Sequence, residues 1–273
     1  MGIKSLIKSI LPKILVKRIS KHSKYGFFGD YATWEDALRN TTGYHSPIIF
    51  EKLKISALKI KNSEDISERD TVVIRGQQQN SFVINKIVEI ARKDGFAKVI
   101  DFGGSFGNTY LQHKRILNGI TNLKWMIIEQ THISEFGQKE FGGDRLEFFN
   151  DDDLDKLLSL ERPNIAMFGS SIQYTEHPYD ILRKMTSNRI DAIIFDRTPL
   201  FSDPNQRERI VVQKVRPEIY DATYPAHVLN EKILVRFMSK KGYLLVESAL
   251  QGHIAIDGYD TITLRGLIFE RTK

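Results

Sequence analysis

The sequence contains no cysteine among its 273 residues. Disulfide bonds, thiolate metal sites and cysteine nucleophiles are therefore excluded as sources of stability or chemistry. Long apolar runs are also missing, because no stretch approaches the ~18 consecutive apolar residues that a membrane-spanning helix requires. The amino terminus has no small-residue cleavage site of a secretory signal. We therefore expect a cytoplasmic protein whose core is built from the 41% of its residues that are hydrophobic.

Net positive charge is confined to the first 24 residues. That segment holds seven lysines and arginines and no acid, whereas the formal net charge of the whole chain is only +6. The rest of the chain therefore carries a net charge of −1. Such a body lacks the basic surface with which nucleic-acid-binding proteins neutralise phosphates. No nucleic-acid partner is expected.

The basic segment at residues 1–24 is also amphipathic. Apolar side chains recur at the spacing of one helical face and are flanked by lysines: Ile3, Leu6, Ile7, Ile10 and Leu11. This pattern is typical of a helix that lies in an anionic membrane surface, which would place the protein peripherally at the inner face of the membrane. A basic helix that packs on the rest of the protein, or a disordered tail, fits the same residues.

A glycine cluster follows a short apolar run near the middle of the chain. The run at 98–102 predicts a buried parallel strand, and the residues after it predict a tight turn with three glycines: Gly103, Gly104 and Gly107. Asn108 or Thr109 can cap a following helix that continues to Leu117. In an open α/β sheet, such a turn brings backbone close to a nucleotide-like ligand. The dinucleotide fingerprint G-x-G-x-x-G is not met, and a plain strand-turn-helix or a phosphate loop remain alternatives.

Two acidic residues flank this turn. Asp101 comes two residues before the first glycine, where a carboxylate can pair with an ammonium group. Glu129 ends the next apolar strand, 124–129, and follows the last glycine by about 22 residues, a spacing at which an acid accepts hydrogen bonds from ribose hydroxyls. NAD enzymes share that acid, and a solvated residue at a strand end is its other interpretation.

The turn resembles the first motif of the class I S-adenosylmethionine (SAM)-dependent methyltransferases. That motif reads acid-x-Gly-x-Gly-x-Gly, and here serine replaces the middle glycine. The resemblance implies that SAM is the cofactor and that one set of residues holds it: Asp101, Gly103, Gly104, Ser105, Gly107 and Glu129.

Further cofactor contacts are expected after the third and fourth strands. Asp151 and Asp152 follow a strand predicted at 145–149, and either could face the adenine amino group, as acids do in SAM enzymes. Capping of the next helix explains them equally well. The fourth strand, 164–170, ends at Ser170, in a loop beside the cofactor. That loop lacks the Asn/Asp-Pro-Pro-aromatic tetrapeptide of enzymes that methylate adenine amino groups.

An acid at the end of the fifth strand, 191–196, is expected to point at the same crevice. Asp196 is the first candidate for the group that takes a proton from a methyl acceptor. His177 and His227 are the alternatives, because an unperturbed histidine has a pKa near ~6.5. Residues expected to orient the acceptor are Tyr174, Arg197, Lys214 and Tyr224. No metal is expected, although Asp196 with Asp203 could hold Mg²⁺ in an alternative mechanism.

The stretch between Asp196 and a helix expected to start near His227 is interpreted as a long functional loop. The polar and aromatic side chains of this stretch would border the crevice at the end of the fifth strand.

Short blocks spread over residues 25–270 form a further pattern. They include Gly29-Asp30-Tyr31, Asp101-Phe102-Gly103-Gly104-Ser105, Ile128-Glu129-Gln130, Asp196-Arg197-Thr198-Pro199, Gln213-Lys214-Val215 and Tyr220-Asp221-Ala222-Thr223-Tyr224-Pro225. These blocks resemble a family of bacterial methyltransferases associated with surface-polysaccharide biosynthesis. The resemblance implies an α/β, Rossmann-like class I methyltransferase sheet, mostly parallel with an antiparallel last strand. It also implies O-methylation of a sugar, glycan or glycolipid precursor.

We divide the chain into a basic amphipathic segment at 1–24, a helical cap at 25–95 and a SAM-binding domain at 96–273. Three other functions remain open. They are a non-catalytic nucleotide-binding module that keeps the sheet, an NAD-linked enzyme, and a methyltransferase for another small-molecule acceptor. The lack of cysteine excludes the cysteine-dependent route to methylation of pyrimidine carbons.

Overall fold

The computed structural model describes residues 24–43, 47–62, 66–69, 72–75, 81–217, 219, 221–256 and 261–272. The amphipathic helix predicted within residues 1–24 lies outside the described residues, apart from Lys24. Its membrane, packed and disordered interpretations therefore all stay predictions.

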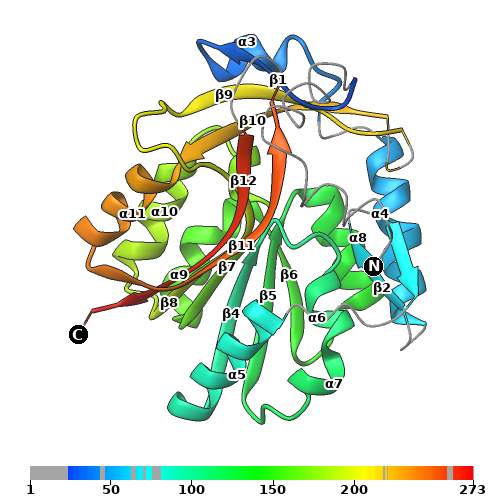
Figure 1. Ribbon diagram of the computed structural model, residues 1–273. Helices are drawn as coiled ribbons and strands as arrows, with labels where there is room; N and C mark the ends of the chain where they lie inside the picture. The colour runs from blue at the N-terminus through cyan, green and yellow to red at the C-terminus, as the bar shows by residue number, and fades with distance from the viewer. Residues whose placement is uncertain are drawn as a thin grey trace.

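The described residues form alternating strands and helices (Figure 1). The strands are β1 (Gly26–Tyr31), β2 (Ile66–Arg69), β3 (Val72–Arg75), β4 (Ala97–Phe102), β5 (Leu123–Glu129), β6 (Leu146–Asn150), β7 (Ile165–Gly169), β8 (Ala192–Phe201), β9 (Arg209–Lys214), β10 (Thr223–Asn230), β11 (Tyr243–Ala255) and β12 (Thr261–Arg271). The helices are α3 (Trp34–Leu38), α4 (Pro47–Lys61), α5 (Ser81–Asp94), α6 (Asn108–Gln112), α7 (Lys114–Leu117), α8 (Thr131–Phe141), α9 (Leu154–Glu161), α10 (Pro178–Ser187) and α11 (Glu231–Lys240), with short 3-10 turns η1 (Asp151–Asp153) and η2 (Ile172–Tyr174).

One twisted sheet organises the structure. Its strands run in the order β6-β5-β4-β7-β8, all parallel, and β12 then pairs antiparallel with β8. The edge strand β11 pairs antiparallel with β12. This order, with its antiparallel closing strand, is the predicted Rossmann-like class I methyltransferase sheet, so the expected fold class is confirmed.

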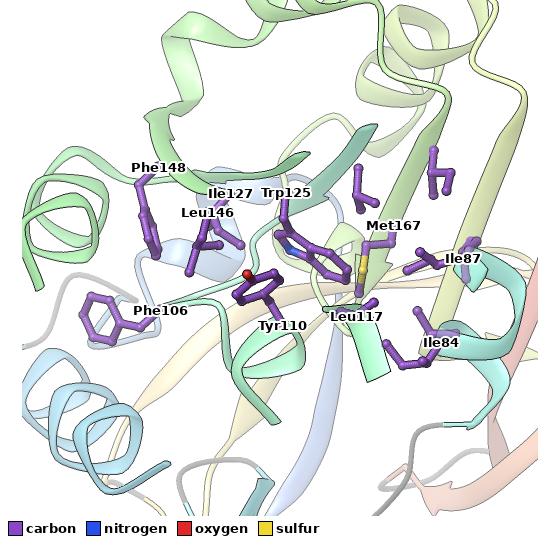
Figure 2. Close-up of a cluster of buried hydrophobic side chains, with 14 of the residues drawn as sticks. Ile84, Ile87, Phe106, Tyr110, Leu117, Trp125, Ile127, Leu146, Phe148 and Met167 are labelled. Atoms are coloured by element: carbon purple, nitrogen blue, oxygen red, sulfur yellow. The ribbon is translucent and has the colours of Figure 1, made fainter. Parts of the chain in front are cut away.

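Helices cover both faces of the sheet, which explains why its central strands are apolar throughout. Along β4, Val99 packs into one core with α5, α6 and α8, whereas Ile100 packs into a second core with α9, α10 and α11. Successive side chains of a strand point to opposite faces, and both faces are buried here. Figure 2 shows the first core, in which Trp125 lies at the centre with Tyr110 beside it. Asp101 shares a sheet face with Val99 and Trp125 because it lies two residues after Val99.

The stretch after Asp196 is a sheet extension and not a long loop. Strand β8 continues to Phe201, β9 and β10 pair antiparallel, and β10 joins β8 in parallel at its far end. The helix predicted to start near His227 begins instead at Glu231, where the Asn230 side chain accepts hydrogen bonds from the first turn. His227 lies within β10, where it pairs with Ile210 of β9.

Residues 25–95, interpreted as a helical cap, contain strands as well as helices. Strand β1 pairs antiparallel with β9 and completes a three-stranded layer, β1-β9-β10, that lies above the carboxyl ends of the parallel strands (Figure 1). The strands β2 and β3 form a separate antiparallel pair. The helices α4 and α5 both contribute buried residues to the first core.

Candidate functional site

A cavity of about 1130 Å³ lies at the carboxyl ends of the parallel strands. The turns after β4, β5 and β7 form its floor together with Asp196 and Arg197 of β8. Residues of the β1-β9-β10 layer, such as Phe27, Gln213 and Tyr224, form the opposite wall. This is the position at which open α/β sheets bind ligands, because the loops diverge there.

The glycine turn after β4 closely approaches its neighbours. A Cβ atom on Gly103 would lie 2.5 Å from the Ser171 Cβ, and one on Gly104 would lie 2.6 Å from the carboxyl carbon of Asp101. Gly103 also has a left-handed φ of 68°. Only glycine therefore fits at these two positions without movement of the neighbours.

Ser105 adopts a left-handed backbone conformation, which glycine takes more readily than other residues. Its φ is 53°, which is uncommon for a residue with a side chain. The helix after the turn begins at Asn108 with Gly107 as its N-cap, so the predicted capping by Asn108 or Thr109 is wrong. That helix ends at Gln112, and a separate short helix covers Lys114–Leu117, which breaks the single helix predicted to Leu117.

Asp101 is buried beneath this turn. Its side chain accepts a 3.1 Å hydrogen bond on Oδ2 from the Trp125 indole Nε1, and the residue is 1% exposed. The pKa of Asp101 is raised to about 7, mainly by burial, while the indole hydrogen bond lowers it and the charges of Glu129 and Asp196 raise it. Among the described residues, no donor reaches Oδ1 of Asp101. Oδ1 is therefore a buried acceptor without a hydrogen-bond donor in the described part of the chain.

Glu129 joins the end of β5 to the glycine turn. Its Oε1 accepts a hydrogen bond from the Ser105 backbone N–H at 3.0 Å, and its Oε2 accepts one from the Gln130 N–H at 3.1 Å. Burial raises the pKa of Glu129 to about 7, although the two backbone hydrogen bonds act in the opposite direction. Each carboxylate oxygen can accept a second hydrogen bond, so the pair can also receive two hydroxyl groups.

Asp151, Asp152 and Ser170, the further cofactor contacts expected from the sequence, all line this cavity. Asp151 accepts a hydrogen bond from the Asp152 backbone N–H. Within the described residues, no N-cap side chain of the 3-10 turn η1 or of helix α9 forms a capping hydrogen bond, so the helix capping that the sequence offered as the alternative is not seen. The charge of Asp151 also raises the pKa of Glu129, which places the two carboxyls near each other. Ser170 directly follows β7, has a left-handed φ of 58° and lines the cavity.

The side chain of Asp196 belongs to a hydrogen-bonded cluster that was not predicted from the sequence. Gln251, on β11, donates from Nε2 to Asp196 Oδ1 at 2.6 Å. Its Oε1 accepts a 2.6 Å hydrogen bond from the Arg197 backbone N–H, and Arg197 has a left-handed φ of 51°. The Arg197 side chain lies 3.9 Å from the Asp196 carboxylate. No local signal marked Gln251, because its role depends on strand order and on a register shift between Leu250 and Gly252.

Tyr174 and Tyr224 form an aromatic part of the cavity wall. Their rings meet edge to face with centroids 5.0 Å apart, and the Tyr174 hydroxyl donates to Gln213 Oε1 at 2.7 Å. All three line the cavity. Lys214, the next residue after Gln213, is exposed on β9 and does not line it. The structure therefore brings Tyr174, Tyr224 and Arg197 together but separates Lys214 from them.

The two histidines occupy different places. The His177 side chain is 70% exposed at the cavity rim, directly before Pro178 of α10. His227 stacks on Trp34 with ring centroids 5.1 Å apart, and its Nε2 lies 3.1 Å from the Glu176 carbonyl oxygen. Burial lowers the pKa of His227. It lines a smaller neighbouring depression of about 280 Å³ and not the main cavity.

Within the described ranges, no three histidine, aspartate or glutamate residues are placed to hold a metal ion. Asp203 does not line the cavity, so the alternative Mg²⁺ pair with Asp196 is not assembled there. No helix in the described part of the chain is long and apolar enough to cross a membrane.

No model of a known protein family matches the sequence, and no curated protein matches it. Solved structures with a similar arrangement include the N-terminal domain of EvdMO1 in the presence of SAH and D-fucose, which is 13% identical, with 85% of this chain and 100% of that chain covered and a TM-score of 0.48. The human N-acetylserotonin methyltransferase in complex with SAM is 10% identical, with 84% of this chain and 58% of that chain covered and a TM-score of 0.46. The 1,6-didemethyltoxoflavin-N1-methyltransferase of Burkholderia thailandensis, with bound S-adenosylhomocysteine, is 13% identical, with coverage of 71% and 80% and a TM-score of 0.41. At these identities and scores, the likeness assigns neither activity nor acceptor to this chain.

Proposed function

We propose that this protein is a SAM-dependent methyltransferase that acts on a hydroxyl oxygen of a sugar, glycan or glycolipid precursor. One observation carries the cofactor assignment. Two buried carboxyls, Asp101 and Glu129, lie at the glycine turn where β4 and β5 end, and both line the same cavity. SAM presents an ammonium group, which the unpartnered Oδ1 of Asp101 can accept as a donor. It also presents a ribose diol, whose two hydroxyl groups can donate to the two carboxylate oxygens of Glu129.

The residues present fit SAM better than a dinucleotide. A pyrophosphate at this turn would lie against the buried carboxyl of Asp101, which disfavours a second anion, whereas the ammonium group of SAM would pair with that carboxyl. Asp151 adds a third carboxyl near Glu129. Ser105 does not argue against a cofactor site, because its backbone takes the left-handed conformation of the glycine that the motif would have.

Bound SAM supplies a methyl group on a positively charged sulfur. Residues of this chain would then align the acceptor, exclude water and remove its proton. Asp196 is our choice for the proton acceptor, because it lines the cavity from within β8 and Gln251 fixes its carboxylate. His177 at the rim is the remaining histidine candidate, whereas His227 lies outside the main cavity.

The acceptor wall supports a hydroxylated substrate. Tyr174 and Tyr224 offer ring surface, and Gln213 and Arg197 offer hydrogen-bonding groups on the same cavity. Aromatic faces combined with amide and guanidinium groups suit the apolar and hydroxyl faces of a sugar ring. The family resemblance of the sequence blocks favours a surface-polysaccharide precursor, and another small-molecule acceptor is the second candidate.

The proposal is tested by incubating the protein with methyl-labelled SAM and cell-envelope glycan fractions. We expect label to enter a glycan or glycolipid fraction with the wild-type protein. Asp196→Asn should lower this transfer by ~10²-fold or more, because it removes the proton acceptor. Asp203→Asn, an exposed aspartate outside the cavity, is the matched control and should transfer normally. Full transfer by Asp196→Asn and loss in His177→Ala would move the role to the histidine.

A further inference from the structure

The indole of Trp125 is the hydrogen-bond donor to Asp101 that the structure supplies from below the glycine turn. Trp125 is fully buried on β5, and the ring of Tyr110 packs against it at a centroid distance of 5.7 Å (Figure 2). Such packing holds the indole in one orientation. An indole N–H can donate but cannot accept, so it pairs with a carboxyl oxygen that carries a lone pair toward it.

The hydrogen bond from the indole makes the two carboxyl oxygens of Asp101 different. Oδ2 accepts from Trp125 at 3.1 Å, whereas Oδ1 has no donor among the described residues although the residue is 1% exposed. Gly104 lies directly against this carboxyl, since a Cβ there would lie 2.6 Å from Oδ2 and 2.9 Å from Oδ1. A buried polar atom without a partner costs free energy, and a ligand that supplies a donor recovers it.

We propose that Trp125 is a positioning residue of the cofactor site, which holds Oδ2 of Asp101 so that Oδ1 receives the ammonium group of the methyl donor. The inference rests on the proposed function and deepens it, because it names how the chain recognises the amino-acid end of SAM. Trp125 itself is in the core and does not line the cavity.

The charged groups around Asp101 oppose its ionisation, whereas the indole hydrogen bond favours it. Glu129 from β5 and Asp196 from β8 both face Asp101 and raise its pKa, in addition to burial, and the indole is the group that favours the ionised form. Arg197 lies beside Asp196, and Asp151 acts on Glu129. A cationic ammonium is the missing partner of this acidic group. Its binding should therefore keep Asp101 ionised at pH values at which the free protein holds a proton there.

The indole N–H signal in a nitrogen-15 NMR spectrum tests the proposal on the intact protein. The chain has two tryptophans, so Trp34→Phe assigns the signal of Trp125. In the free protein, we expect the Trp125 signal to shift with a midpoint near pH 7, following the Asp101 pKa of about 7. Saturating SAM should hold the signal at its high-pH position down to about pH 6. Methylthioadenosine, which lacks the amino-acid end, should not do so.

A control separates Asp101 from the other titrating groups. Asp101→Asn should remove the pH-dependent shift of the Trp125 signal, whereas Glu129 cannot produce it through a hydrogen bond, because its oxygens accept from Ser105 and Gln130. The Trp34 signal reports the stacked His227 instead. A Trp125 signal that responds neither to pH nor to SAM would overturn the proposal.

A binding measurement completes the test. Trp125→Phe should weaken SAM binding by about tenfold or more at pH 7 and leave methylthioadenosine binding unchanged, because only the amino-acid end is affected. Trp34→Phe should change neither affinity. An equal loss for both ligands would show that Trp125 has only a structural role. A wild-type protein that binds neither ligand would instead overturn the proposed function, so the two failures are distinguishable.

Discussion

The side chain of Gln251 reaches the Asp196 carboxylate across an intervening strand. Gln251 is on β11, Asp196 is on β8, and β12 pairs with both. The crossing passes over Gly266 of β12, where a Cβ would lie 3.0 Å from the Gln251 Nε2 atom. A glycine at that position leaves room for the amide. Two residues that are 55 positions apart thereby form a 2.6 Å hydrogen bond at the cavity.

Loss of this amide should weaken the fold as well as the site. Gln251→Ala removes a hydrogen bond to a buried carboxylate and the acceptor for the Arg197 N–H. Hydrogen bonds to charged groups contribute ~1.5–3 kcal/mol, so the free energy of unfolding in urea should fall by about that amount. His253→Ala, an exposed position on the same strand, is the matched control and should change little. Equal stability of the two variants would contradict the role given to Gln251.

A methyl group on the glycine turn should damage the cofactor site. Gly104→Ala would place a Cβ 2.6 Å from the Asp101 carboxyl carbon, so the turn or the carboxyl must move. We expect SAM affinity to fall by about tenfold or more, since small-to-large changes at packed positions cost ~1–3 kcal/mol. Gly143→Ala, at an exposed position with no neighbouring atom within 4 Å, should bind SAM normally. Normal binding by both variants would show that the turn does not hold the cofactor.

The parallel strands and the acidic residues of the site could be predicted from the sequence. The side chains that form hydrogen bonds with the site residues could not. Continuous apolar runs identified β4 and β5, and the glycines after β4 located Asp101 and Glu129, because these signals are local. Gln213, Gln251 and Trp125 gave no such signal. Their contacts depend on which strands lie side by side and in which register, and those are properties of the folded chain.

The sheet extension was missed for a related reason. Residues 209–230 contain polar and aromatic side chains with short apolar stretches, a composition that fits a loop equally well. Pairing of β9 with β1 and β10 buries Val211 and Val212 of β9 and most of β10, and so stabilises them as strands. His227 thereby became a strand residue stacked on Trp34, at a distance from the cavity that its sequence position did not reveal.

The two buried carboxyls should make the stability of the ligand-free protein depend on pH. The pKa of Asp101 is raised from 3.8 to about 7 and that of Glu129 from 4.5 to about 7, so the folded state keeps protons that the unfolded state releases. Stability should therefore fall as pH rises from about 4.5 to about 7, by up to ~1.4 kcal/mol per pH unit for each group, and change little above that range. Urea unfolding at several pH values measures this slope.

The control for this pH dependence is the double variant Asp101→Asn, Glu129→Gln, which lacks both titrating carboxyls. The lowered pKa values of His113 and His227 act in the opposite direction below about pH 6.5, and they act equally in both proteins. The difference in unfolding free energy between wild type and double variant should therefore change steadily between about pH 4.5 and 7. A constant difference would show that neither carboxyl holds an extra proton in the folded state.

The amphipathic segment at residues 1–24 gives a separate prediction. Its +7 charge and apolar face should bind the full-length protein to liposomes that contain anionic lipid, and added salt should weaken the binding. A version that begins at Tyr25 should not sediment with them, and neutral liposomes are the control for the lipid charge. Equal sedimentation of both versions would place any membrane contact elsewhere in the chain.

Calorimetric titration of the purified protein with SAM, S-adenosylhomocysteine and NAD tests the central claim most directly. We predict that SAM and S-adenosylhomocysteine bind and that NAD does not. Glu129→Ala should weaken SAM binding by ~1.5–3 kcal/mol, because the ribose loses its carboxylate, whereas the exposed Glu135→Ala should bind as wild type does. Binding of NAD alone, or of none of the three ligands, would contradict the account.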